Sequence, residues 1–134
     1  MFLEKELSYK TLGCLFAVRN KYGSGHREII YDRAFQEELD KENIPYVSKP
    51  HVPLYSITTG KKIGVFIPDY AIKNKIIVEL KALPFIRIDD ANQLIEYLKI
   101  SSYEIGYLVN FGERIFKPKR LIYTNDKKSF LINL

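Results

Sequence analysis

With 134 residues, 46% of them hydrophobic, the chain is long enough to bury one core and too short for two, so we expect a single domain over residues 1–134. One cysteine, Cys14, excludes an internal disulfide and a cysteine-based zinc site, which fits a reducing compartment. The formal charge of +5, from 21 Lys and Arg against 16 Asp and Glu, is a modest excess that would attract a polyanion at low salt.

The first residues and the lengths of the apolar runs indicate in which compartment we expect the protein. Glu4 and Glu6 stand where a secretory signal would need apolar residues. No stretch approaches the roughly 18 apolar residues of a membrane span. We therefore expect a soluble, cytoplasmic protein that does not bind a membrane.

Two helices are predicted in the first third of the chain. Apolar and small residues recur at helical spacing from about residue 3 to residue 20, where the pattern is formed by Leu7, Thr11, Cys14, Leu15 and Val18. Residues 22–25 end this helix, and Ser24 is a possible cap for a second helix from His26 to Lys41.

The second predicted helix carries a carboxylate on its core-facing stripe. Glu28 precedes Tyr31, Phe35 and Leu39 on one face, because steps of three and four residues return to the same side of a helix. Glu28 is either part of a site or a first-turn residue that the helix dipole stabilises, and the helix alone does not decide between the two.

Short strands are predicted in the middle of the chain. Residues 44–47 and 52–57 contain prolines, which favour the edge of a sheet. Residues 63–72 and 75–83 should pair as one hairpin around Asn74, which tolerates positive φ. With Asn74 at the centre of a three-residue loop, Asp69 lies directly opposite Glu79.

Strand alternation then sets the faces of this hairpin. It places Asp69, Glu79 and Lys81 on one face and Leu80 on the other.

The last third of the chain predicts a helix followed by strands. Asp90–Gln93 resembles a capping box that opens a helix ending near Lys99. Residues 106–111 read as a strand, a turn follows at Gly112, and residues 120–123 are the last strand. This order of elements predicts a mixed sheet that helices cover on both faces.

Charged side chains at the end of the predicted strand 75–83 indicate a site. Glu79 and Lys81 follow an unbroken apolar run, where a charge costs several kcal/mol unless a metal ion or hydrogen-bond partners satisfy it. Carboxylate and carbonyl oxygens are the ligands that Mg²⁺ prefers. We therefore predict a Mg²⁺ or Mn²⁺ site for phosphodiester cleavage, with Asp69, Glu79 and the Leu80 carbonyl as ligands.

Other polar residues complete the predicted site. Lys81 could orient the attacking water or steady the scissile phosphate, and Glu28 would be a further ligand, direct or through water. Gln93 could hydrogen-bond the water or a phosphate. The alternative interpretation is a solvated hairpin that carries a surface Glu/Lys pair.

Residues 25–31, Gly-His-Arg-Glu-Ile-Ile-Tyr, match the motif of the GxxExxY proteins, which are assigned to the PD-(D/E)XK nuclease superfamily. The resemblance extends from about residue 4 to residue 123 through the segments 6–10, 31–39, 64–69, 77–82, 93–98 and 106–112. Two departures are Phe35, where a leucine is usual, and the apolar stretch 65–68 before Asp69.

The resemblance implies a fold and a set of residues. The implied fold is a restriction-endonuclease-like α/β/α sandwich with a central mixed sheet. The superfamily's acidic and lysine positions fall on Glu28, Asp69, Glu79 and Lys81, with Gln93 as the helix glutamine.

These features together predict a Mg²⁺- or Mn²⁺-dependent nuclease that acts on nucleic acid, on DNA in preference to RNA. A homodimer is a mild expectation, since single-site domains often cut two strands as a pair. Two rivals stay open. One is a catalytically silent nucleic-acid-binding or assembly protein with the same fold, and the other is a nuclease subunit that needs a partner to recognise its substrate.

Overall fold

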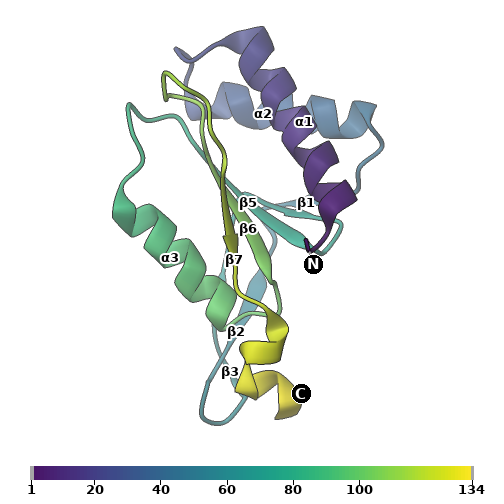
Figure 1. The fold of residues 1–134 in the computed structure, drawn as a ribbon, viewed down its shortest axis with the longest axis vertical. Coiled ribbons are helices and arrows are strands. Elements are labelled where there is room, and N and C mark those ends of the chain that lie inside the picture. The colour runs from purple at the N-terminus through teal and green to yellow at the C-terminus, as the bar shows by residue number, and fades with distance from the viewer. Residues whose placement is uncertain (1, 134) are drawn as a thin grey trace.

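Three helices enclose a five-stranded mixed sheet in this computed structural model, which describes residues 2–133 (Figure 1). The helices are α1 (Lys5–Tyr22), α2 (Glu28–Lys41) and α3 (Ile88–Lys99). The strands are β1 (Tyr46–Ser48), β2 (Val52–Tyr55), β3 (Lys62–Phe66), β4 (Tyr70–Ile72), β5 (Ile76–Lys81), β6 (Ile105–Asn110) and β7 (Lys119–Ile122). Two short 3₁₀ helices follow, η1 (Asn125–Lys127) and η2 (Ser129–Asn133).

The sheet has the order β1-β4-β5-β6-β7, in which only β5 and β6 run parallel. Strand alternation divides β5 between two cores. Val78 and Leu80 pack with α1 and α2 on one face, whereas Ile77 packs with Leu94 and Leu98 of α3 on the other. The predicted mixed sheet with helices on both faces is therefore confirmed.

The predicted strand 63–72 is interrupted in the structure. β3 pairs with β2 in a separate two-stranded sheet, and β4 begins only at Tyr70. Pro68 lies between the two strands and has no N–H to donate to a ladder, so the chain leaves one sheet before it joins the other. The hairpin β4–β5 has the predicted register, with Ile72 opposite Ile76 and positive φ at Lys73 and Asn74.

Helix starts differ from the predicted caps. α2 follows Arg27 and α3 follows Arg87, and neither residue makes a side-chain cap hydrogen bond. At α2 the Tyr31 hydroxyl orders the preceding loop instead, because it donates to the Gly23 carbonyl at 2.7 Å and accepts from the His26 N–H at 3.1 Å. None of the helices within residues 2–133 is long and apolar enough to cross a membrane.

Candidate active site

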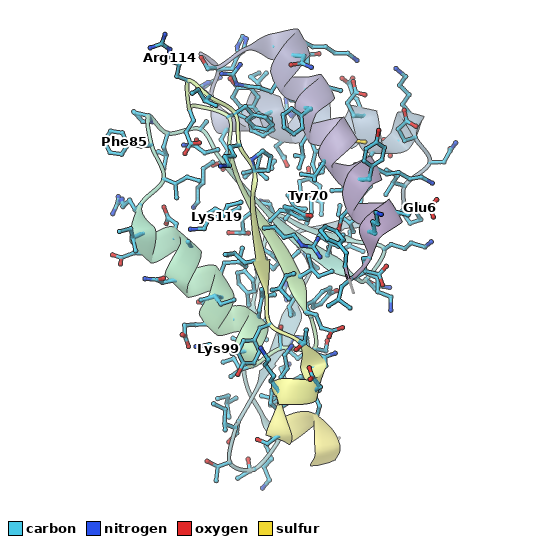
Figure 2. All side chains as sticks on the ribbon, viewed as in Figure 1. Glu6, Tyr70, Phe85, Lys99, Arg114 and Lys119 are labelled. Atoms are coloured by element: carbon cyan, nitrogen blue, oxygen red, sulfur yellow. The ribbon has the colours of Figure 1, made fainter. Side chains whose placement is uncertain are left out.

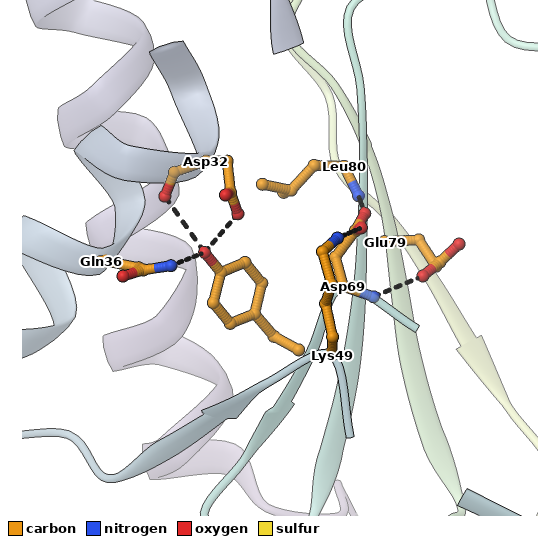
Figure 3. A network of polar contacts seen from close by, with 7 residues as sticks. Asp32, Gln36, Lys49, Asp69, Glu79 and Leu80 are labelled. Carbon is orange, nitrogen blue, oxygen red and sulfur yellow. Dashed lines mark hydrogen bonds and ion pairs between the residues drawn. The ribbon is translucent and has the colours of Figure 1, made fainter. Parts of the chain in front are cut away.

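Asp69 and Glu79 are linked across the start of the β4–β5 hairpin (Figure 3). The Asp69 N–H donates to Glu79 Oε1 at 2.8 Å, and the Leu80 N–H donates to Asp69 Oδ2 at 2.7 Å. Each carboxylate is therefore fixed through one oxygen by a backbone donor of the neighbouring segment. The second oxygen of each carboxylate is available to a further partner.

The interruption at Pro68 explains this arrangement. Continuing the register of Tyr70 with Val78 would place Pro68 opposite Leu80, but the ladder has ended there. The Asp69 side chain takes the place of a strand carbonyl and accepts from the Leu80 N–H. The backbone carbonyl of Asp69 meanwhile accepts from the Lys49 N–H at 2.8 Å. Asp69 is thus held by hydrogen bonds from Leu80 and Lys49 at the point where the β4–β5 ladder ends.

The candidate residues divide between the two sides of β5, which differs from the predicted single face. Asp69 and Glu28 line a cavity of about 130 Å³ on the α2 side, next to Leu80. Figure 3 shows Asp69 between Leu80, which points toward α2, and Glu79, whose carboxylate points the other way. Asp69 leaves the expected face because its carboxylate turns toward the Leu80 N–H.

Glu79 and Lys81 lie on the α3 side, as the alternation of β5 predicts. They share a narrow cavity of about 10 Å³ with Gln93 and Asp90 of α3. This volume is close to the smallest that holds one water molecule. The structure thus brings Gln93 to Glu79 and Lys81, while the two hydrogen bonds of Asp69 join this side to the α2 side.

Electrostatics couples the two sides. Burial and then the negative charge of Asp69 raise the pKa of Glu79 from its ordinary 4.5 to about 7, although the Asp69 N–H and Lys81 act in the opposite direction. The pKa of Glu28 is raised by partial burial and then by Asp69, even though its side chain reaches solvent. Asp69 therefore acts on both neighbouring carboxylates, and the three form one cluster of negative charge.

A sequence model of the PD-(D/E)XK nuclease superfamily matches residues 5–121. The chain belongs to this superfamily. The restriction-endonuclease-like fold predicted for it is confirmed by this match and by the mixed sheet between helices. Nucleases of the PD-(D/E)XK superfamily typically use divalent metal ions. Neither the curated proteins nor the solved structures give a significant match to the chain.

Besides the residues predicted from the sequence, the structure adds Asp32 and Lys49 to the cavity on the α2 side. Asp32 stands one helical turn after Glu28, so the spacing alone could have indicated it. Its carboxylate accepts from the Tyr70 hydroxyl, which in turn accepts from Gln36 at 2.9 Å (Figure 3). Lys49 Nζ lies 3.7 Å from Asp69 Oδ1. No local pattern marks Lys49, because it follows β1 in a loop.

The donor set suits a hard divalent cation. In an antiparallel pair the N–H and the carbonyl of one residue point to the same neighbouring strand, so the Leu80 carbonyl points toward β4, as its N–H does. Leu80 lies beyond Val78, the last residue of β5 that pairs with β4. Two carboxylates and this carbonyl are oxygen donors of the kind that Mg²⁺ and Mn²⁺ accept. Across residues 2–133, however, no three His, Cys, Asp or Glu side chains converge into a group that could hold an ion. A cation would therefore draw on the carbonyl and on water besides the carboxylates.

Proposed function

We propose that this protein is a Mg²⁺- or Mn²⁺-dependent nuclease that hydrolyses phosphodiester bonds in DNA. The observation that carries the proposal is the link between Asp69 and Glu79, with Lys81 two residues further along β5. Two carboxylates held this close disfavour each other's charge, and a bound cation relieves that cost. Membership of the superfamily supports a nucleic-acid substrate.

Each residue has a proposed role. Asp69, Glu79 and the Leu80 carbonyl would hold the cation, and Glu28 would add a direct or water-mediated ligand. When bound, the cation supplies positive charge to the phosphate and lowers the pKa of a bound water. Lys81 would donate to a phosphate oxygen and offset the negative charge that grows there. Gln93, across the narrow cavity, would orient a water or a phosphate.

Cleavage assays test this proposal directly. Purified protein is incubated with single- and double-stranded DNA and RNA in Mn²⁺, in Mg²⁺ and in EDTA, and Mn²⁺ binding is followed by calorimetry. We expect DNA to be cut with the metal and to stay intact in EDTA. No cut in any substrate, together with no heat of Mn²⁺ binding, would contradict the proposal. Cleavage confined to RNA would contradict the choice of DNA.

Asp69→Asn sharpens the assay. Asparagine keeps an oxygen for the Leu80 N–H, so the fold should survive, but it removes the charge that a cation needs. We expect cleavage to fall by at least about 100-fold. Asp126→Asn, at an exposed position in η1, is the matched control and should cut like the wild type. Equal activity of the Asp69 and Asp126 variants would remove Asp69 from the site.

A second candidate function is nucleic-acid binding without catalysis. It is favoured by one observation, that the acidic groups face two sides of β5 and no trio among residues 2–133 encloses an ion. Binding would then fall steeply with salt but change neither in EDTA nor in Asp69→Asn. A nuclease that needs a partner would instead bind Mn²⁺ and leave naked nucleic acid uncut.

A further inference from the structure

Two loops follow the C-terminal ends of β5 and β6, and β5 is the strand that carries Glu79 and Lys81. Residues 82–87 follow Lys81 at the end of β5, and residues 111–118 follow Asn110 at the end of β6. Lys81 and Asn110 are register partners in the parallel pair, so both loops begin side by side. Residues from both loops line a common cavity of about 500 Å³. The loops therefore start at the strand end that carries Lys81, and their own cavity is separate from the narrow one that Glu79 and Lys81 line.

The ends of these loops expose apolar and basic side chains together. Phe85 is 75% exposed, and Ile88 and Ile115 are each 78% exposed. Arg87, Arg114 and Lys117 are exposed beside them in the sequence. Figure 2 shows Phe85 and Arg114 at one end of the molecule, above α3. We call these six residues, five from the loops and Ile88 from the first position of α3, the loop-tip surface.

The loops rest on a tightly held base. The Asn110 side chain accepts from the Leu83 N–H at 2.9 Å and donates to the Leu83 carbonyl at 2.9 Å, and it also accepts from the Gly112 N–H at 3.1 Å. A Cβ on Gly112 would lie 2.1 Å from the Leu83 carbonyl oxygen, which only glycine avoids. One side chain and one close backbone contact thus fix the two loops to each other.

The second loop is also held near its tip. Phe116 stacks on Phe111 with ring centroids 5.1 Å apart and meets Phe16 edge-on at 5.0 Å. Arg19 of α1 donates to the Glu113 carbonyl at 2.8 Å. Ile115 stays outside this aromatic cluster although its neighbour Phe116 lies within it. Ile115 is therefore exposed on a loop whose backbone is held in place by the contacts of Phe116 and Arg19.

The mixture of side chains points to one class of ligand. Arg and Lys at the tips complement phosphates, and they would disfavour an apolar protein surface as the partner. Phe and Ile are residues that proteins insert between base steps, where they replace base stacking. An aromatic ring also stacks on an unpaired base, whatever the base is, because every base has a π-face. Together these properties fit nucleic acid in which a base step is already open.

We propose that the loop-tip surface is a wedge that recognises nucleic acid at an unpaired or interrupted base step, so that the protein prefers forked or gapped duplexes to continuous ones. This proposal rests on the proposed function for its ligand class and names the substrate structure that the same site would receive. Phe85 and Ile115 would enter the open step, and Arg87, Arg114 and Lys117 would hold the flanking phosphates.

Binding in EDTA separates recognition from cleavage. Fluorescence anisotropy compares a forked DNA with a continuous duplex of the same length, and a 2-aminopurine at the fork reports unstacking. We expect the wild type to bind the fork about tenfold more tightly than the duplex. The double substitution Phe85→Ala with Ile115→Ala should lose most of this preference and the rise in 2-aminopurine fluorescence, with duplex affinity changed less than about twofold.

A matched control has the same exposed apolar character elsewhere. Ile57 and Ile63 are 65% and 66% exposed beside the β2–β3 turn, and replacing both by Ala should leave fork preference unchanged. Retained preference in the Phe85/Ile115 variant would overturn the wedge, and cleavage by the wild type would leave the nuclease proposal standing. Fork binding that depends on Phe85 and Ile115, with neither cleavage in any metal nor heat of Mn²⁺ binding, would overturn the nuclease proposal and support the wedge.

Discussion

Lys128 and Glu79 are both ionisable side chains that the fold withdraws from water. They differ in the partners that surround them. Lys128 is 3% exposed, and its Nζ donates to the Ser101 carbonyl at 2.9 Å and the Tyr103 carbonyl at 2.7 Å. Burial lowers the pKa of Lys128 to about 8, while Glu104 acts to raise it. Glu79 accepts one backbone N–H, and burial and then Asp69 raise its pKa to about 7.

The difference separates a structural charge from a candidate site. Lys128 finds its acceptors within the chain, and these contacts tie the C-terminal 3₁₀ segment to the loop between α3 and β6. Glu79 has Asp69 beside it, and Lys81 offsets only part of their combined charge. Each region thus contains one ionisable side chain that is largely buried. The second region differs in its excess of negative charge, which is why we propose that it binds a cation.

The largest effect expected from this comparison is on catalysis. Lys81→Met removes the ammonium that we place at the phosphate, so cleavage in Mn²⁺ should fall by about 100-fold or more. The free energy of unfolding should fall by no more than about 1 kcal/mol, because the partly buried Lys81 offsets only part of the charge of Glu79. Single-turnover cleavage and urea unfolding measure the two quantities. Near-normal cleavage would show Lys81 to be an ordinary surface charge.

Lys128→Met should have the reverse profile. It leaves the Ser101 and Tyr103 carbonyls without their donor, so we expect a loss of about 1–3 kcal/mol in the free energy of unfolding. Cleavage per folded molecule should stay unchanged. Lys127→Met, at the exposed neighbouring position, is the control and should shift stability by less than about 0.5 kcal/mol. A more stable Lys128 variant would mean that its burial costs more than its two hydrogen bonds return.

Local signals in the sequence were sufficient for much of the fold. The helical spacing of Thr11, Cys14, Leu15 and Val18 predicted the face of α1 that is buried. Turn chemistry at Asn74 predicted the register of the β4–β5 hairpin, which the pairing of Ile72 with Ile76 confirms. In both cases the deciding interactions join residues close together in the chain, which is why a pattern could reveal them.

Contacts between distant segments were not predictable in the same way. The sequence predicted one strand over residues 63–72, and nothing local showed that β3 and β4 would enter different sheets on either side of Pro68. The turn of Asp69 toward the α2 side depends on where that ladder ends, and Lys49 reaches Asp69 from a loop 20 positions earlier. These features depend on tertiary packing, which overrides strand alternation at the end of a strand.

Glu79→Gln tests whether the raised pKa reflects an unmet charge. The pKa of Glu79 is about 7 in the folded protein against an ordinary 4.5, so the folded state binds more protons between these values. Without metal, wild-type stability should therefore fall as pH rises through this window. In EDTA at pH 8 the variant should be more stable by roughly 1–3 kcal/mol, and near pH 4 the gain should vanish.

Urea unfolding at several pH values measures this difference. Glutamine keeps an oxygen for the Asp69 N–H, so the hydrogen bond is conserved. Glu37→Gln, at an exposed position of α2, is the control and should show little change at any pH. A gain for Glu79→Gln that is equal at every pH would contradict the electrostatic explanation.

The smallest effect concerns Lys49, the cation that already stands near Asp69. Its Nζ is 3.7 Å from Asp69 Oδ1 and its side chain is largely exposed, so Lys49→Ala should change stability by less than about 0.5 kcal/mol. Removing a competing positive charge should tighten Mn²⁺ binding by about two- to fivefold at low salt. This gain should shrink as salt rises, because screening weakens the repulsion between Lys49 and the ion. Weaker Mn²⁺ binding would instead indicate that Lys49 orients the Asp69 carboxylate, and an unchanged affinity in Lys62→Ala would confirm that the effect is local.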